Sequence, residues 1–155
     1  MARAASFDAQ DVTILGQTLH FVVPPPEGTV DVAIVYNSLT PGSAQEAEQI
    51  EATVRNSPSV AGVTLNPFVV GVEKLNTRHF MVAITADGAG TPVLKDLLVS
   101  RHAICMTAHL EQVQSGTCQI YVTSSPSVDI RLNQSASDAA DIHFATAFRI
   151  MVHTL

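Results

Sequence analysis

Short apolar runs separated by helical patterns constrain the fold of this chain more than any other feature. The segments "TVDVAIVYN", "HFMVAIT" and "AICMT" each have the continuous apolar character of a strand buried on both faces. Polar turns and helical spacing follow the first two, in "SLTPGSAQEAEQIEATVRNS" and "DGAGTPVLKDLLVSRH". Hydrophobic residues make up 46% of the 155 residues, which suits a sheet covered by helices on both sides. The sequence therefore predicts an α/β fold with a mostly parallel sheet.

Each helical segment is expected to turn one apolar face toward the sheet. Ser43 is placed to cap the first helix, because a serine side chain can accept a hydrogen bond from a free backbone N–H group. The positions expected to face inward are Ala47, Ile50 and Val54 in the first helix, and Val93, Leu94, Leu97 and Leu98 in the second.

The N-terminal third is expected to add extended structure. The segment "DVTILGQTLHFVV" resembles two short strands around a turn at Gly16 and Gln17, which predicts a β-hairpin or an edge ribbon. Residues 1–10 are expected to be disordered. Further along, "VAGVTLNPFVVG" has the composition of a strand, but Pro67 makes its second half a poor central strand because proline cannot donate to a neighbouring strand.

The C-terminal part predicts an antiparallel strand pair followed by a helix. The strands "TCQIYVT" and "VDIRL" flank a turn at residues 124–127, and alternation in the second strand indicates an antiparallel edge with one dry face. Phe144, Phe148 and Met151 then recur at helical spacing, so we expect a helix that closes the core. Together these elements predict one three-layer sandwich over residues 1–155, built on a mixed sheet.

Charge and hydropathy exclude two classes of partner. The formal net charge is −6, and the eight Lys and Arg residues are spread along the chain, so no basic surface for nucleic acid is expected. No run approaches the ~18 apolar residues that span a bilayer. The start "MARAASFDAQ" lacks the apolar stretch of a signal peptide, although it could be a mature start after removal of a leader.

The C-terminal third resembles the YfiR/HmsC-like family of small periplasmic proteins. The resemblance is carried by "RHAICMTAHLEQVQSGTCQIYVTSSPSVDIRLNQSASDAADIHFATAFRIMV", including a glycine turn at Gly116 and an asparagine-alanine motif. The residues matching that motif and the final helix are Asn133, Ala136, Phe144, Phe148, Arg149 and Met151. Family members often have glycine where this chain has Asp141, and we expect the terminal helix to break there. The hairpin around Gly16 is expected to replace the family's N-terminal helices.

This resemblance implies a regulator that acts by protein contact. Named members of the family sit in the periplasm and restrain a membrane-bound diguanylate cyclase through its outward domain. We therefore expect a periplasmic, non-enzymatic regulator with a membrane signalling protein as partner and a homodimer as a candidate assembly.

A second resemblance supports an alternative function. The family fold looks like one lobe of a periplasmic solute-binding protein, and "VAIVYNSLTPGSAQEAEQIEA" is similar to the opening unit of ABC-type substrate-binding components. The alternative is therefore a single-lobe small-molecule binding protein or a transport accessory.

Candidate ligand-binding residues lie in the loops that follow the predicted parallel strands. Ligands of open α/β sheets gather beyond the carboxyl ends of the strands, where helix N-termini present free N–H groups and favour small anions. The residues expected there are Asn37, Thr40, Gly42, Ser43, Asp87, Gly88 and Thr107. The simpler alternative is that the glycines and Pro41 only turn the chain, because "DGAG" lacks the rest of a dinucleotide fingerprint.

Cys105 and Cys118 could form a disulfide or remain buried thiols. Neighbouring strands joined by a short loop can bring two cysteines within bonding range, and such a bridge would contribute about 3 kcal/mol. With His102 and His109 the cysteines have the composition of a zinc site, but on an extended strand His102 and Cys105 point to opposite faces. We therefore expect no metal site from this set.

Catalytic motifs are absent from the sequence. There is no G-x-S-x-G segment, no phosphate-binding loop and no H-E-x-x-H pair. We therefore expect no enzyme activity, no catalytic residue and no cofactor, although a hydrolase or transferase with unfamiliar residues is a weaker third possibility.

Overall fold

The computed structural model describes residues 7–57, 59–60 and 62–155 and confirms the predicted α/β class. Within these residues one mixed sheet has the strand order β2-β3-β1-β4-β5-β6-β7-β8. The strands are β1 (Thr29–Tyr36), β2 (Ser59–Val60), β3 (Val63–Gly71), β4 (Val82–Thr85), β5 (Ile104–Thr107), β6 (Ile120–Thr123), β7 (Asp129–Leu132) and β8 (His153–Thr154).

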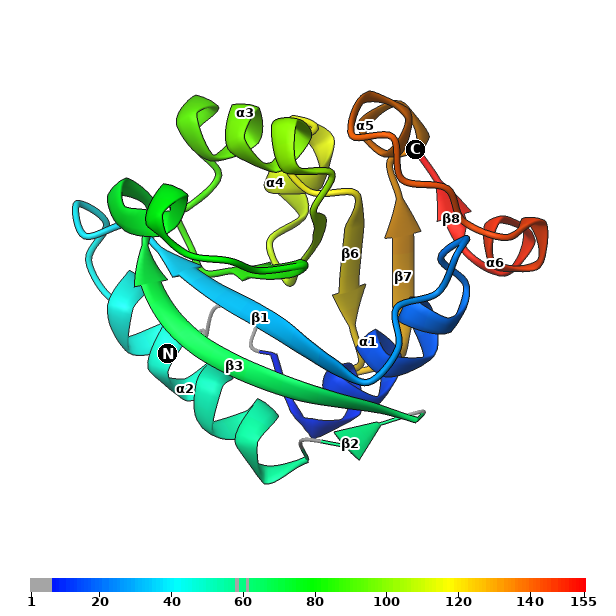
Figure 1. The fold of residues 1–155 in the computed structure, drawn as a ribbon, viewed down its shortest axis with the longest axis horizontal. Helices are drawn as coiled ribbons and strands as arrows, with labels where there is room; N and C mark the ends of the chain where they lie inside the picture. Colours follow the sequence, from blue (N-terminus) through cyan, green and yellow to red (C-terminus); the bar gives the residue numbers. More distant parts are fainter. Residues whose placement is uncertain (1–6, 58, 61) are drawn as a thin grey trace.

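Helices cover both faces of the sheet, so the three-layer arrangement is present (Figure 1). The helices are α1 (Ala9–His20), α2 (Ser43–Asn56), the 3₁₀ helix η1 (Val72–Thr77), α3 (Pro92–Arg101), α4 (Leu110–Gln114), α5 (Gln134–Ala139) and α6 (Thr146–Met151). Helices α1 and α2 lie below the sheet in the view of Figure 1, whereas α3 and α4 lie above it. In the described part of the chain, no helix combines the length and the apolar character needed to cross a bilayer.

Alternating side chains of the central strands pack into two separate hydrophobic cores, one on each face of the sheet. Val32 and Ile34 of β1 join the core that α1 and α2 cover, whereas Ala33 and Val35 join the core that α3 and η1 cover. Successive side chains of a strand point to opposite faces, so a strand with helices on both sides must be apolar throughout. This explains why the strand segments read as continuous apolar runs.

Strand β1 lies where the connections of the sheet change direction. It pairs in parallel with β3 on one side and with β4 on the other. Pro67 lies in β3 opposite Val32 of β1, and the far side of β3 pairs with β2 only at residues 63 and 64. Pro67 is therefore tolerated because its missing N–H faces the open edge of the sheet.

The C-terminal elements agree with prediction except at two points. Strands β6 and β7 are antiparallel, but the two residues of β8 pair in parallel with β7, so β7 is not the edge strand. The helix breaks as expected, because Asp141 has a φ of 57° between α5 and α6. Phe144 and Phe148 stack with ring centroids 5.0 Å apart in the core, whereas Met151 is 67% exposed and does not close it.

The predicted N-terminal hairpin is wrong, because residues 9–20 form helix α1. Val12, Leu15 and Leu19 follow a helical spacing and are buried, a periodicity that competes with the strand pattern in the sequence. Asp8 and Asp11 form a reciprocal capping box that starts this helix. The expected disorder of residues 1–10 is also wrong for residues 7–10, since Phe7 is buried and α1 begins at Ala9; residues 1–6 lie outside the described part.

Helices α2 and α3 differ from prediction in their caps and faces. Gly42 is the N-cap of α2, and Ser43 is the first helical residue because its hydroxyl is held by neighbouring loops. Thr91 caps α3 with a hydrogen bond to the Leu94 N–H. Ala47, Ile50, Val54, Leu94 and Leu98 are buried as expected, but Leu97 is half-buried and Val93 is 65% exposed.

Gly16 is required by the packing of α1 on β2 and not by a turn. A Cβ atom at residue 16 would lie 2.5 Å from Cγ2 of Val60. We predict that Gly16→Ala lowers the free energy of unfolding by about 1 kcal/mol, because the overpacking cost of about 1–3 kcal/mol exceeds the gain in helix propensity of about 1 kcal/mol. Urea denaturation followed by circular dichroism measures this change. Gln17→Ala, on the exposed side of α1, is the control, and a more stable Gly16→Ala protein would contradict the packing explanation.

Candidate functional site

The loops after β1 and β4 meet at the carboxyl ends of the strands and bind each other. The Asn37 side-chain amide donates to the Gly88 carbonyl at 2.9 Å, and the Ser43 hydroxyl donates to the Asp87 carbonyl at 2.7 Å. The same hydroxyl accepts the Asn37 N–H at 2.9 Å. These bonds join the two sides of the point where ligands of open α/β sheets usually enter.

Thr40 fills the remaining space between these loops. Gly88 has a φ of 77°, and any Cβ atom there would collide with the Thr40 side chain. Only glycine therefore combines this left-handed conformation with such a close contact. These contacts fill the space between the two loops with the protein's own groups.

A carboxylate lies in the first turn of α2. Glu46 accepts the Asp87 N–H on Oε1 at 3.0 Å. A negative side chain in this turn is stabilised by the helix dipole, and its charge opposes the approach of an external anion. The predicted preference of these loops for small anions is therefore weakened by Glu46.

His109 lies on the other side of Glu46. Its Nε2 is 2.6 Å from Glu46 Oε2, and its backbone N–H donates to Thr107 Oγ1 at 3.1 Å. The side chain is only 8% exposed. Burial alone would lower the pKa of His109, but the hydrogen bond to Glu46 and the charges of Glu46, Asp87 and Glu111 raise it above 6.5 overall.

An open cavity of about 360 Å³ lies one strand further along, beyond β4 and β5. It is lined by Asp87, Gly88, Gly90, Glu111, Gln112 and Ser115. Asp87 and Glu111 give it two exposed carboxylates. Within the described part of the chain, no lysine or arginine is within 4.0 Å of the carboxylate oxygens of Glu46, Asp87 or Glu111. Lys95 Nζ donates to the carbonyl of the lining residue Ser115 at 3.2 Å, so one ammonium lies near two carboxylates and the net charge is negative. The cavity therefore favours a cation or a group rich in N–H donors.

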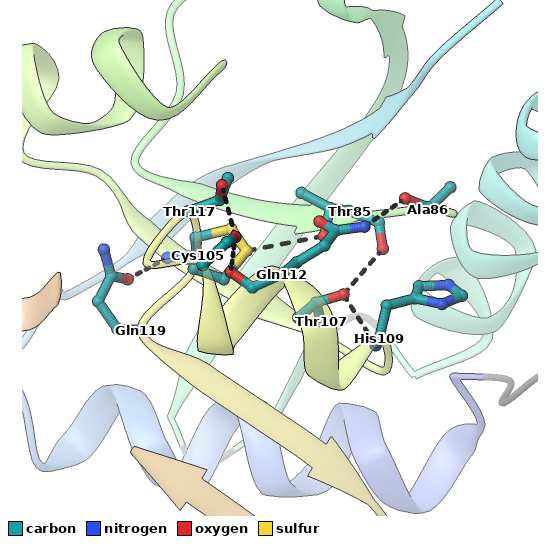
Figure 2. Close-up of a disulfide and its surroundings, with 10 residues drawn as sticks. Thr85, Ala86, Cys105, Thr107, His109, Gln112, Thr117 and Gln119 are labelled. Atoms are coloured by element: carbon teal, nitrogen blue, oxygen red, sulfur yellow. Dashed lines mark hydrogen bonds between the residues drawn. A yellow bond between two sulfur atoms is a disulfide. The ribbon is translucent and has the colours of Figure 1, made fainter. Parts of the chain in front are cut away.

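Gln112 places an unsatisfied acceptor in the wall of this cavity. Its Nε2 donates to the Ala86 carbonyl at 2.9 Å, as Figure 2 shows, and this bond fixes the side-chain amide. Its Oε1 lies on the Gly90 side and has no hydrogen-bond partner among the described residues, although the side chain is only 4% exposed. A buried acceptor without a donor costs about 1–3 kcal/mol, so a donor that reached this oxygen would stabilise the folded chain.

The structure separates the predicted ligand residues into four groups. Asp87 and Gly88 line the cavity, whereas Asn37, Thr40 and Ser43 bind the two loops together. Gly42 only begins α2 in a left-handed conformation. Thr107 is fully buried, where its hydroxyl accepts the His109 N–H and donates to the Thr85 carbonyl at 3.4 Å.

Sequence reasoning missed Glu46, Glu111 and Gln112. Glu46 could have been found from its place in the first turn of α2, where side chains face the loops at the strand ends. Glu111 and Gln112 follow β5 on the short helix α4, and the sequence gives no periodic signal for a helix of five residues. Their positions depend on the turn that follows Thr107.

Cys105 and Cys118 are joined by a disulfide between β5 and the segment that leads into β6 (Figure 2). Both cysteines are fully buried, and Thr85 Oγ1 lies 3.6 Å from Cys118 Sγ. His102 caps the end of α3 and its Nδ1 lies 2.8 Å from the Ala140 carbonyl oxygen. The set of two cysteines and two histidines therefore does not assemble, and only His109 points toward the acidic cavity residues.

The pKa of His109 should respond to the loss of Glu46. In wild-type protein kept in EDTA, protonated His109 stabilises the fold below about pH 6.5, and this contribution is lost as the pH rises through the higher folded-state pKa. We predict that Glu46→Gln lowers the pKa of His109, because burial then opposes protonation with less compensation. NMR titration of the imidazole measures it, with Glu48→Gln on the exposed side of α2 as control. An unchanged titration in Glu46→Gln would rule out this pairing.

Comparison with known proteins supports the fold. No protein-family model matches the chain, and no curated protein matches it. Among solved structures, a Streptococcus pneumoniae ABC domain in complex with L-Trp aligns with a TM-score of 0.62 and 12% identity over 92% of this chain. A conserved domain protein from Vibrio cholerae O1 biovar El Tor aligns with a TM-score of 0.58 and 12% identity over 94% of this chain. The chain spans 59% of the length of each of these two proteins, and at this identity the likeness shows a shared α/β fold.

Proposed function

We propose that this chain is a small-molecule binding domain whose ligand carries a positively charged amino group. The observation that carries the proposal is the cavity beyond β4 and β5, where Asp87 and Glu111 face open space without a lysine or arginine within 4.0 Å in the described part of the chain. Two carboxylates at a cavity rim form charge-assisted hydrogen bonds with an ammonium group. The proposal assigns no reaction and no cofactor to the domain.

The position of the cavity agrees with the general behaviour of this fold. Ligands of open α/β sheets bind beyond the carboxyl ends of the strands, and about 360 Å³ is within the usual range for a small-molecule site. One of the similar structures is an ABC domain in complex with L-Trp, which gives an amino acid as the first ligand class to test. The two similar proteins are longer than this chain, so the likeness in fold does not show a transport role. A role in transport therefore belongs to the proposal.

A periplasmic location is included in the proposal. The buried Cys105–Cys118 disulfide supports an oxidising compartment, because cytosolic reductants keep most thiols reduced.

A thermal-shift screen in EDTA tests the ligand class. We predict that basic amino acids or polyamines raise the melting temperature by about 5–10 °C near 100 times Kd, because binding to the folded state adds about 2.7 kcal/mol. Nucleotides should give no shift, since their phosphates meet like charges at Asp87 and Glu111. Glu111→Gln should reduce the shift and Glu48→Gln should retain it. A shift with anions alone would reject an amine site.

A second candidate function is the regulation of a membrane signalling protein by contact, as the resemblance to the YfiR/HmsC-like family implies. The observation that favours it is an apolar groove of about 320 Å³ at the opposite, amino-terminal edge of β4 and β5. Its lining includes Val23, Pro25, Met81 and Ile142, and Val23 and Met81 are exposed. Exposed apolar surface of this kind marks many protein interaction sites.

Complementation in the native host tests the regulatory function. Deletion of the gene should raise cyclic di-GMP, because a restraint on the cyclase is lost. Wild-type protein should restore the level, whereas a Val23→Asp/Met81→Asp variant should not, because two charges in the groove oppose docking. Leu39→Asp, at the other edge of the sheet, is the exposed control and should complement fully. Full complementation by the double variant would exclude the groove, and an unchanged cyclic di-GMP level after deletion would exclude the regulatory function.

A further inference from the structure

We propose that Asp87, His109 and Glu111 form a binding site for a divalent transition-metal ion, with Glu46 orienting His109. One ligand atom from each of the three residues lies within 4.8 Å of the others. They come from the loop after β4 and from the turn that begins α4, so the fold brings them together from two strand ends. This inference goes beyond the proposed function, because an ion needs only these side chains and no organic ligand.

The hydrogen bond to Glu46 fixes which nitrogen of His109 is free. Nε2 is 2.6 Å from Glu46 Oε2, so a neutral imidazole places its proton on Nε2 and donates it to this carboxylate. Nδ1 then carries the lone pair, and it lies 3.9 Å from Glu111 Oε1 with no hydrogen-bond partner among the described residues. A histidine that donates one N–H to a carboxylate and turns its other nitrogen toward a second carboxylate, here Glu111, has the arrangement of a metal ligand.

Gln112 lies beside this cluster and carries an acceptor that the described residues leave unpartnered. Its unpartnered Oε1 belongs to a side chain that is 96% buried, and the residue lines the same cavity as Asp87 and Glu111. The bond from Nε2 to the Ala86 carbonyl fixes the side-chain amide with Oε1 on the Gly90 side. In the proposed site a metal-bound water would reach this enclosed oxygen after a small movement of the Gln112 side chain, and it would supply the missing donor because waters on a divalent cation are strong hydrogen-bond donors.

The charge and the donor types select the kind of ion. One imidazole and two carboxylates suit Zn²⁺, Co²⁺ or Mn²⁺ better than Ca²⁺, which prefers oxygen ligands alone. Tetrahedral Zn²⁺ with bonds of about 2.0 Å holds its ligand atoms about 3.3 Å apart, so the side chains must close slightly around the ion. Glu111 can make this movement because its side chain is 66% exposed. Three protein ligands leave a fourth position open to water.

Titration of metal-stripped protein with ZnCl₂ by isothermal calorimetry tests this site. The expected result is one Zn²⁺ per chain with Kd in the micromolar range or below. His109→Ala should weaken binding by at least about 100-fold and Glu46→Gln by about 10-fold to 100-fold, as for other groups that orient a metal ligand. Co²⁺ should give visible absorption bands of a four-coordinate site, and His109→Ala should lose them. His153→Ala, at an exposed histidine in β8, is the control and should leave the affinity unchanged.

Two results would overturn the inference. One is Zn²⁺ binding no tighter than millimolar in wild-type protein, and the other is unchanged affinity in His109→Ala. If His109→Ala does not fold, the Glu111→Gln variant is used instead, because this exposed side chain contributes little to the core. Glu111→Gln should weaken Zn²⁺ binding by at least about 10-fold. An unchanged affinity in Glu111→Gln would also overturn the site. The Zn²⁺ titrations contain no organic ligand, and the thermal-shift screen with amines contains EDTA. Failure of the metal site in the first experiment therefore leaves the proposed amine binding untouched, and the reverse also holds.

Discussion

The parallel pairing of β1 with strands on both sides is the constraint on which the rest of the molecule depends. It buries β1 on both faces, so Val32 and Ile34 must pack under one helical layer while Ala33 and Val35 pack under the other. It also forces the chain to leave β1 in one direction and to return past it to β4, which places two loops side by side at the carboxyl ends. Any functional chemistry at this edge starts from groups that these loops supply.

The protein uses the two loops to close the usual entrance instead of opening it. Ser43 satisfies polar backbone groups on both sides, and each bond replaces one that a ligand could have made. Because Glu46 lies in the first turn of α2, the local charge is negative where many α/β proteins collect anions. The open space lies beyond β4 and β5, and in the described part of the chain the carboxylates there have no lysine or arginine within 4.0 Å. This shift by one strand changes the expected ligand from anion to cation.

The sequence was sufficient where one local pattern had a single physical meaning. The apolar runs could only be strands with helices on both sides, and the resemblance to a family that often has glycine in place of Asp141 indicated the break that the positive φ of this residue confirms. Prediction failed where two periodicities overlapped. Val12, Leu15 and Leu19 fit a helix, but the same segment also fits two strands, and Gly16 resembles a turn until Val60 is known to pack on it. Prediction of the site failed for another reason. Glu46 and His109 are 63 residues apart in the sequence, and only the tertiary structure brings them together.

The two edges of the central strands have opposite chemical character, and this separates the two proposed functions physically. The carboxyl edge is acidic and holds a buried amide oxygen without a donor, so the ligands that we propose for it are small, polar and cationic. The amino edge has Val23 and Met81 around an apolar groove, and a partner protein that covered this groove would gain free energy from burying apolar surface.

The two edges are connected by strands of four residues, because β4 and β5 run from the groove to the cavity. A ligand in the acidic cavity could affect a partner at the apolar groove only if the sheet had two conformations and the ligand bound one of them more tightly. Coupling between two sites requires this difference in affinity. The closed, hydrogen-bonded loops and the buried disulfide beside them oppose a second arrangement. The structure therefore favours two sites that act independently, and occupancy of the acidic cavity should not change what the apolar groove can bind.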